Sequence, residues 1–533
     1  MAPDSNALLT SAPFPFDVSS CHAWIRQLLE TLQRTQRENE QLQHRLDQLL
    51  RKLYGRSQEK LDPSQMLLFA DLLQQLQQEA DRPAETPAPA SETPVPPSRS
   101  KGHGRRRLPT DLPRQTKVHD LPEVEKPCPC CGTPRTVIGQ EVSEQLDFEP
   151  AKLFVVEHVR LKYACPNCEQ NAAEGGPQIE TAEKPLWPIE KGLAAPGLLA
   201  YVMVSKYGDH LPLHRLEQIL QRHDIEIARS TLCDWAAQAA EALKPLYDLM
   251  VRETLASKVM HTDDTPVNVL DRNRNETRTG RFWVYLGDRN HPQTVFAYTP
   301  SRSRDGPMNF LRDWGKEEKR YLQADAFGGY DGIYAGQAGG QVVEAACWAH
   351  TRRKFYEARN TDLAVSTQVL AYIRLLYDVE DQTRELSSLE RARLRQEQAL
   401  PILTKFKQWL HTQQAEHGGT VLPKSPLGQA ITYAFNQWDA LGIYTTDGDL
   451  AIDNNAAENA LRRVALGRKN WLFCGSDKGG QTAAILFSLI ATCQRHQVNP
   501  FTYLRDVLTR IAAHPMPRLA VLLPNRWIPT PQG

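Results

Sequence analysis

The strand pattern between residues 257 and 358 constrains the fold more strongly than any other part of this chain. Three β-rich segments, SKVMHTDDTPVNVL, GRFWVYLGD and TVFAYTP, are separated by polar turns. A helical segment around residues 309–314 follows. After it come the strand-like RYLQADAFGGYDGIY and QVVEAACWA, and the second of these leads into the basic helical stretch HTRRKFYEA. This order, β-β-β-α-β-α-β, predicts a mixed α/β core.

The same order is that of a ribonuclease H-like domain, and it brings acidic side chains together. Asp263 lies on the first expected strand, and Asp325 lies at the end of the fourth, which is adjacent to the first in that fold. A third carboxylate, Glu458, comes from a later helix. Carboxylates of this kind can hold two metal ions roughly 4 Å apart for phosphoryl transfer, and Mg²⁺ prefers such oxygen ligands. Each Asp alone could instead belong to a turn or a helix cap.

Glu458 stands at the start of a basic helix, in the stretch AIDNNAAENALRRVALGRKNWL. With Asn455 at the N-cap, Glu458 three residues later fits a capping box, and a Glu also suits the positive end of the helix dipole. We expect Glu458 to help hold cations as well, and the two roles can coexist. The segment between residues 459 and 496 contains six Lys and Arg residues but only one Asp. Such a segment, Arg462 included, suits DNA phosphates, although solvated basic faces are common.

Length and composition set outer limits. A chain of 533 residues is too long for one compact domain, and its 63 Lys and Arg balance its 63 Asp and Glu, so net charge indicates no partner. Residues 1–17 lack a secretory signal, and the longest apolar run, residues 192–204, is too short to span a bilayer. We therefore expect a cytoplasmic protein with no membrane association, in which paired cysteines bind metal.

Residues 1–80 are expected to form a dimerising coiled coil. Nine residues, seven of them apolar, fall on alternating a and d positions over four heptads: Ile25, Leu28, Leu32, Thr35, Asn39, Leu42, Leu46, Leu49 and Leu53. An Asn at an a position, here Asn39, favours a parallel dimer in fixed register. The alternative is an amphipathic helix packed on its own chain.

Residues 81–118 are expected to be a disordered basic linker. The stretch from 82 to 97 is rich in Pro, Ala, Glu and Thr, and it runs into a cluster that contains Arg105, Arg106 and Arg107. Such an arm could lie along DNA. A solvated linker without a partner explains the composition about as well.

Two C-x-x-C motifs predict a structural zinc site in residues 119–190. Cys128 and Cys131 form one, Cys165 and Cys168 form the other, and β-rich sequence separates them. Four thiolates from two such turns give the tetrahedral shell of a zinc ribbon. Cys130 is left over, and disulfides or chance pairing are the alternatives. A closed shell indicates a folding role, here in a DNA-binding domain.

Residues 191–250 are expected to contain a helix-turn-helix-like helical pair. The first helix, LPLHRLEQILQRH, has an apolar face through Leu213, Leu216, Ile219 and Leu220. A turn begins at Asp224, and Ser230 can cap the second helix, whose Leu232 and Trp235 should face the core. The second helix carries little positive charge, so a helical pair without base reading is equally consistent.

These segments and those that follow give a multidomain α+β chain. The expected catalytic core occupies residues 251–358 and 447–512, and the second part carries Glu458. A helical insertion, residues 359–446, separates the two parts, and residues 513–533 form a C-terminal tail.

In combination, several motifs make the chain similar to one family. They are LYGRSQEKL, CPCC with CPNC, SKYGDHLPLHR, HTDDTPV, LQADAFGGYDGIY, CWAHTRRKF, DNNAAENALR, GRKNWLFCGS and YLRDVL. On these the chain resembles, almost end to end, the large transposase of insertion sequence 66 elements, a DDE transposase. A mostly helical insertion between the second Asp and the Glu is a feature of that family, and residues 359–446 fit it.

The resemblance implies roles for particular residues. It makes Asp263, Asp325 and Glu458 the metal-binding triad. It implies that His350, Arg353, Arg468 and Lys469 contact or orient DNA phosphates. Four positions depart from the family pattern, namely Asp224, Asp264, Asn459 and Arg463. None removes an expected ligand, and Asp is tolerated in the left-handed conformation at a turn. Asp264 remains a rival to Asp263, and opposite faces of one strand would separate the two.

The function expected is that of a transposase. Such an enzyme binds the ends of its own element, cuts the 3′ ends and joins them to target DNA, with Mg²⁺ or Mn²⁺ at the active site and a structural Zn²⁺. Expected partners are DNA, a second copy of the chain or a higher oligomer, and accessory proteins of the same element, in a nucleoid-associated setting. A non-catalytic DNA-binding regulator, a nuclease that cuts without joining, and a degraded copy are the alternatives.

Overall fold

A computed structural model describes residues 153–156, 162–164, 179–181, 186–190, 192–271 and 276–529. The expected coiled coil, the linker with Arg105, Arg106 and Arg107, and the four zinc ligands Cys128, Cys131, Cys165 and Cys168 lie outside these residues. Two compact units divide the chain. Residues 153–156 belong to the unit Pro83–Val159, and every helix and strand below belongs to the other unit. Within the described residues, no helix is both long and apolar enough to cross a membrane.

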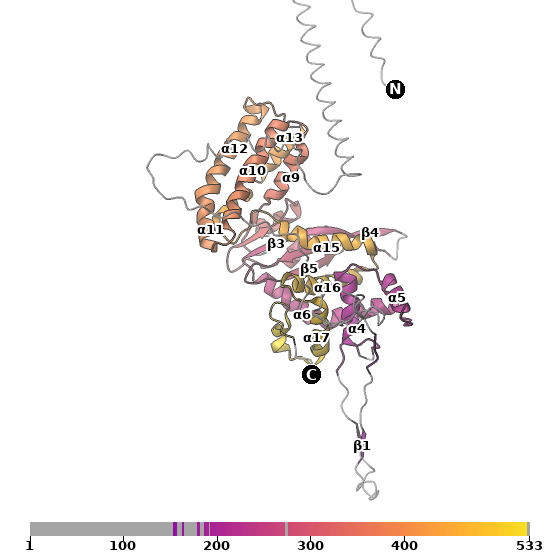
Figure 1. Ribbon diagram of the computed structural model, residues 1–533. Coiled ribbons are helices and arrows are strands. Elements are labelled where there is room, and N and C mark those ends of the chain that lie inside the picture. The colour runs from indigo at the N-terminus through magenta and orange to yellow at the C-terminus, as the bar shows by residue number, and fades with distance from the viewer. Residues whose placement is uncertain are drawn as a thin grey trace, which may run out of the picture. The chain divides into compact units, whose positions relative to one another are not determined.

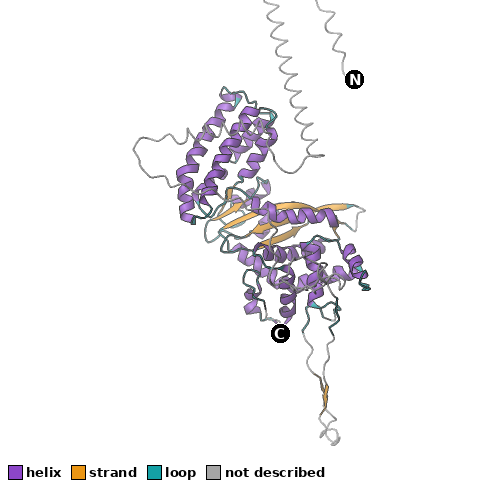
Figure 2. Ribbon diagram, in the orientation of Figure 1, coloured by secondary structure: helices purple, strands orange, loops and turns teal. Residues whose placement is uncertain are grey.

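A mixed six-stranded sheet forms the centre of this unit (Figure 2). Its strands are β3 (Val259–Leu270), β4 (Thr277–Leu286), β5 (Thr294–Thr299), β6 (Arg320–Gln323), β7 (Val342–Ala345) and β8 (Phe473–Cys474). The order is β5-β4-β3-β6-β7, with β8 beside the end of β3. The pairs β5-β4 and β4-β3 are antiparallel, whereas β6, β7 and β8 join in parallel. The expected adjacency of the first and fourth strands is confirmed, and β8 is a strand that the sequence reading missed.

Helices cover the sheet, and together with its strands they form two hydrophobic cores (Figure 1). Their bounds are α4 Pro196–Met203, α5 Leu213–Gln221, α6 Arg229–Leu255, α7 Asp305–Phe310, α8 Asp331–Tyr334, α9 Trp348–Ala358, α10 Leu363–Thr383, α11 Ser388–Leu394, α12 Leu400–Gln413, α13 Pro426–Asn436, α14 Trp438–Gly442, α15 Asn455–Trp471, α16 Asp477–Arg495 and α17 Pro500–Arg510. A short strand pair, β1 (Lys162–Ala164) and β2 (Ile179–Thr181), forms a separate antiparallel sheet.

The edge strand β5 is completed by α16. Its backbone N–H groups at Thr294 and Phe296 donate to the hydroxyls of Thr492 and Ser488, at 3.0 and 2.8 Å. An edge strand otherwise presents unpaired N–H groups to solvent or to another chain. Close approach is possible because Gly480 has no side chain: a Cβ there would come within 2.6 Å of the Tyr298 ring. Two hydroxyls on a buried helix face therefore satisfy the sheet edge.

A second core lies beyond the β6–β7 side of the sheet and is built by α9, α10, α12, α13 and α14. Its helix starts follow local rules, as at Ser387, which caps α11 in a capping box with Glu390. Arg395 is buried in this region, with its side chain 1% exposed. The guanidinium donates to both carboxylate oxygens of Glu380 and to the carbonyls of Tyr444 and Asp447. These partners explain how a charged group lies in an apolar core.

The expected helical pair at residues 191–250 is present as α5 and the long α6. Leu213, Leu216 and Leu220 are buried, as are Leu232 and Trp235, as the apolar spacing predicts. Asp224 has a positive φ of 58°, which agrees with a left-handed turn. Much of α6 packs against α16 and β5, so it is a core helix along most of its length.

The expected cap at Ser230 is wrong. Helix α6 begins at Arg229, its N-cap is Ala228, and no side chain caps it. The backbone N–H of Arg229 donates instead to the carboxylate of Glu217 on α5, at 3.0 Å. A tertiary partner has replaced the local cap.

Near the other end of the chain, residues expected to form a tail include Leu519, Leu522 and Leu523, which are buried.

Two arginines close together in sequence should differ sharply in their effect on stability. Arg395→Ala leaves Glu380 buried without its partner, so we expect a loss of about 3–5 kcal/mol in the free energy of unfolding. Arg393→Ala removes only a surface pair with Glu397, at a position 79% exposed, and should cost less than about 1 kcal/mol. Urea unfolding of the two variants beside wild type measures both. Equal losses would contradict the structural role assigned to Arg395.

Candidate active site

Asp263 lies in the middle of β3, on the face that α15 covers. Alternate residues of a strand point to opposite faces. Helix α15 contacts this face at both ends, because Asn454 meets His261 and Arg468 meets Thr265. One oxygen of Asp263 accepts the backbone N–H of Asp264 at 2.7 Å. Across the described ranges no Lys, Arg or His forms an ion pair with Asp263, so its charge has no cationic partner there.

Asp264 points to the opposite face and is occupied. Its carboxylate is 1% exposed and pairs with Arg281 at 2.8 Å and with Arg302 at 2.9 Å. Each of its oxygens therefore already accepts hydrogen bonds from a guanidinium. This placement agrees with the expectation that opposite faces of one strand separate the two acids, and it gives Asp264 a different set of partners from Asp263.

Asp325 comes from the loop after β6. Since β6 runs parallel to β3 with Gln323 opposite His261, Asp325 and Asp263 each stand two residues beyond the same paired position. Arg302 lies 3.8 Å from one oxygen of Asp325. The other oxygen is buried without a hydrogen-bond partner. A buried carboxylate oxygen without a donor is costly unless something else supplies positive charge.

Glu458 lies in the first turn of α15 and faces an arginine and a histidine from α9. Arg353 lies 3.2 Å from one oxygen and the His350 ring 3.4 Å from the other. The oxygen near His350 has no hydrogen-bond partner and is buried. His350 and Glu458, which the sequence analysis assigned separately to DNA contact and metal binding, thus lie together.

Asn454 fastens the start of α15 to the sheet. Its side chain donates to the carbonyl of Thr262 at 2.8 Å and lies 3.0 Å from the His261 ring. Its own N–H donates to the sulfur of Cys347. On the other side, Tyr377 of α10 donates to the carboxylate of Asp453 at 2.8 Å. The sequence analysis missed Asn454, and the only available signal was its place immediately before the expected helix.

The expected capping box at the start of α15 is wrong. The helix begins at Asn455, its N-cap is Asn454, and no side chain caps it. The amide of Asn454 is already used against β3, and the side chain of Asn455 donates to Asp453 at 2.8 Å. Glu458 is therefore free of a capping role, and its oxygens turn toward α9.

Burial changes the protonation of these acids. It raises the pKa of Asp263 to about 7, and the nearby charges of Asp325, Asp264 and Glu458 add to the effect. Burial also raises the pKa of Asp325, although Arg302 and His350 oppose it. For His350 burial lowers the pKa, against the attraction of Glu458. Acids that raise one another's pKa in a partly buried site are typical of positions that bind a cation.

The carboxylates suit a divalent cation, although their present arrangement is not that of a formed metal centre. Among the residues that the structure describes, no three His, Cys, Asp or Glu side chains are arranged to hold one ion. The donor set nevertheless fits Mg²⁺ or Mn²⁺: three carboxylates, of which Asp325 and Glu458 each have a buried oxygen without a partner. Arg302 and Arg353 now lie beside these acids.

The other expected basic residues divide into two groups. Arg462 and Lys469 are exposed on α15, where a phosphate can reach them. Arg468 instead donates to Thr265 at 2.9 Å and to the carbonyl of Pro266, so it holds the end of α15 against β3. Of the two sets, only the exposed side chains are free of partners on the sheet.

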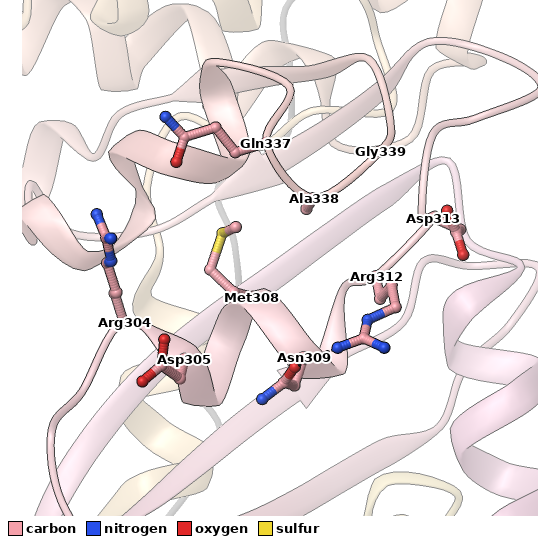
Figure 3. A pocket seen from close by; sticks show the side chains of 9 residues that line it. All are labelled: Arg304, Asp305, Met308, Asn309, Arg312, Asp313, Gln337, Ala338 and Gly339. Atoms are coloured by element: carbon pink, nitrogen blue, oxygen red, sulfur yellow. Dashed lines mark hydrogen bonds between the residues drawn. The ribbon is translucent and has the colours of Figure 1, made fainter.

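A polar pocket elsewhere in the described structure is lined by none of the three acids. It has a volume of about 420 Å³ and lies between α7 and the loop before β7 (Figure 3). Arg304, Asp305, Met308, Asn309, Arg312, Asp313, Gln337, Ala338 and Gly339 line it. Its lining is mainly polar, and Arg304 connects it to the loop that carries Arg302.

Comparison with family models decides the classification. The model described as "Transposase IS66 family" matches residues 191–482. The chain belongs to the IS66 family of transposases. Three further models of this transposase match other parts: the zinc-finger binding domain of transposase IS66 at residues 125–169, the IS66 C-terminal element at 488–525, and "Transposase C of IS166 homeodomain" at 41–116.

Related proteins come from Sinorhizobium fredii (strain NBRC 101917 / NGR234). The transposase is 32% identical to the uncharacterized protein y4hP over 444 residues, which are 79% of this chain and 77% of that one. It is 31% identical to the uncharacterized protein y4qI over 430 residues, 78% of this chain and 77% of that one. Both similarities extend over most of each chain.

Adjacent asparagines of the transposase should differ in their effect on the active site. Asn454→Ala removes the bonds that hold α15 to β3, and we expect a loss of about 1–3 kcal/mol with faster hydrogen exchange at the start of α15. Asn455→Ala removes only an exposed bond and should cost less than about 1 kcal/mol. Urea unfolding and site-resolved exchange test this. Equal exchange rates in the two variants would contradict the anchoring role.

Asp263 should make stability depend on pH in a definite direction. Its folded pKa of about 7 lies above its ordinary value of 3.8, so the folded protein keeps a proton that the unfolded chain releases. The free energy of unfolding should fall as pH rises from about 4 to about 7, by at most about 1.4 kcal/mol per pH unit.

Urea unfolding of metal-free protein at about pH 5 and pH 7 measures this dependence, and Asp263→Asn isolates the contribution of the one group. The variant should show the smaller fall, because Asn does not titrate in this range. An identical pH dependence in the two proteins would refute the shifted pKa.

Proposed function

We propose that this chain is a DDE transposase that cleaves DNA at the ends of its own element and joins those ends to target DNA. Support comes from three carboxylates supplied by β3, the loop after β6 and the start of α15, namely Asp263, Asp325 and Glu458. The strand order β5-β4-β3-β6-β7 supports a ribonuclease H-like core. The single observation that carries the proposal is the pair of buried, unpartnered carboxylate oxygens on Asp325 and Glu458.

The triad residues would hold the divalent ions. Bound Mg²⁺ or Mn²⁺ would activate a water or a 3′-hydroxyl and stabilise the leaving oxygen. Asp263 binds best when ionised, and a nearby cation would favour its ionised form by lowering its pKa. Arg353 pairs with Glu458, and the His350 ring lies beside its other oxygen, so Glu458 turns toward α9. Asn454 positions the helix that carries Glu458.

Two kinds of basic side chain serve DNA binding in this proposal: exposed ones, and ones that are bonded to other parts of the protein. Arg462 and Lys469 are exposed on α15, the helix that begins with Glu458 in its first turn, and Arg353 is exposed on α9. His350 orients Glu458, and Arg468 fixes the end of α15. The charge-assisted contacts of Arg and Lys with phosphates would hold the strand in place.

Segments outside the described residues would supply recognition and assembly. The zinc-finger model over residues 125–169 supports a Zn²⁺ bound by Cys128, Cys131, Cys165 and Cys168. The coiled coil in residues 1–80 would pair two copies so that both element ends enter one complex. Arg105, Arg106 and Arg107 and the α5–α6 pair would add DNA contacts. The proposed partners also include accessory proteins encoded by the same element, and the proposed location is the nucleoid.

The test is cleavage of DNA that carries the element's own ends. We expect metal-dependent nicks at the 3′ ends and joined products from wild type, and a loss of at least about a hundredfold in Asp263→Ala, since transition-state stabilisation of this kind contributes about that much. Asp248→Ala is the matched control, because Asp248 is an exposed acid on α6 that pairs with Lys244.

Each outcome has a separate meaning. Nicks without joined products would identify a nuclease. Binding without cleavage, also after the accessory proteins are added, would identify a regulator or a degraded copy. Equal activity in Asp263→Ala and wild type would refute the assigned triad.

A further inference from the structure

We propose that Arg302 binds a backbone phosphate of the DNA beside Asp325, and that Asp264 and Phe327 are positioning residues that hold Arg302 for this task. The inference rests on the proposed function, since it assigns part of the same site. Neither the triad nor the basic helices include these three side chains.

The guanidinium of Arg302 is held at a fixed place. Its Nε donates to one oxygen of Asp264 at 3.0 Å, and its Nη2 lies 2.9 Å from the same oxygen in an ion pair. The second oxygen of Asp264 accepts from Arg281 at 2.8 Å. Charge-assisted bonds to a carboxylate that is 1% exposed are among the stronger ones in proteins. Two arginines share Asp264, and the second acid near Arg302, Asp325, lies farther away at 3.8 Å.

A ring supports the guanidinium from one side. The centroid of the Phe327 ring lies 3.9 Å from the guanidinium carbon of Arg302, within range of a cation–π contact. The ring is itself held by Trp283 and Tyr330, whose ring centroids lie 6.2 and 5.7 Å away. Arg302 is thus fixed both by hydrogen bonds and by stacking, so little conformational entropy remains to be lost on binding.

Gly329 makes this stacking possible. A Cβ at Gly329 would stand 2.1 Å from the Phe327 ring, so any side chain there displaces the ring. At the neighbouring Gly328 a Cβ would meet only a side-chain oxygen of Asp331, at the ordinary contact distance of 3.4 Å. The Gly-Gly pair after Asp325 therefore contains one glycine that the ring requires and one that it does not.

Arg302 is partly open to solvent and lies beside Asp325. Its side chain is 38% exposed, and Nη2 lies 3.8 Å from Asp325, too far for a hydrogen bond. Within the described ranges, Nη1 donates to no protein atom. A rigid guanidinium with a free nitrogen matches phosphate oxygens well. Two residues on, Arg304 lines the polar pocket beside α7 together with Asp305, Arg312 and Asp313 (Figure 3).

The first experiment measures the salt dependence of binding to element-end DNA without divalent metal. Losing one phosphate contact lowers the slope of log K against log salt concentration by about 0.9. We expect this fall in Arg302→Ala, partial retention of the slope in Arg302→Lys, and no change in Arg393→Ala, an exposed arginine on α11. A wild-type slope in a folded Arg302→Ala would overturn the inference.

The second experiment tests positioning and remains decisive if Arg302→Ala is unstable. Gly329→Ala should weaken DNA binding severalfold, whereas Gly328→Ala should not. Asp264→Asn should weaken it, and Asp264→Glu, which keeps the charge, should restore part of the affinity. In the Arg302→Lys background, Gly329→Ala should lose most of its effect, because Lys makes a weaker contact with the ring.

The outcomes separate this inference from the function on which it rests. Wild type that cuts element ends while Gly329→Ala and Gly328→Ala bind DNA equally well would overturn the role of Arg302 alone. Equal weakening by Gly329→Ala in the wild-type and Arg302→Lys backgrounds would show a general structural effect and also overturn it. Failure of wild type to bind or cut the ends would overturn both proposals.

Discussion

The parallel pairing of β3 with β6 determines where the candidate active site can form. It brings residue 325, just past the end of β6, level with residue 263 in the middle of β3, although the two are far apart in the sequence. The pleat then separates Asp263 from Asp264, because side chains alternate between faces. One face receives α15 and Glu458, and the other receives the arginines. A change in register by one residue would exchange these two acids.

The acids on the two faces of β3 differ in their electrostatic surroundings. On the α15 face of the described structure, Asp263 has no cationic partner, and burial raises its pKa to about 7. On the other face, Asp264 is saturated by Arg281 and Arg302. The same residue type thus occurs side by side in a state that attracts cations and in a state already neutralised. Such contrast between neighbouring acids is a common basis for different roles in one site.

Sequence patterns predicted the strands and the positions of the acids. They did not predict the tertiary contacts of the side chains. Alternating apolar residues and polar turns predicted β3 to β7, and the expected strand order correctly placed Asp325 beside β3. The caps failed for a shared physical reason. Glu217 and β3 supply tertiary partners at Arg229 and Asn454, and a local rule such as the capping box does not include distant partners.

Arg302 shows a different limit of sequence reading. It lies in the polar stretch SRSRD, whose composition is that of an ordinary surface turn. Its importance depends on an acid 38 residues earlier and a ring beyond the next strand. The two-residue strand β8 escaped for a similar reason, since so short a segment has no period of its own. These features exist only once the chain is folded.

The segment that delivers Glu458 is tied to two different cores. Asn454 is bonded to the sheet, whereas Tyr377 on α10 holds the preceding Asp453 from the second core. Cooperative units of a protein can open separately, at free energies below that of global unfolding. An opening of the helices around α10 would release one of these two tethers while the ladder between β3 and β6 stayed intact. The completeness of the acid triad therefore depends on the local stability of a helical region that contributes none of its three members.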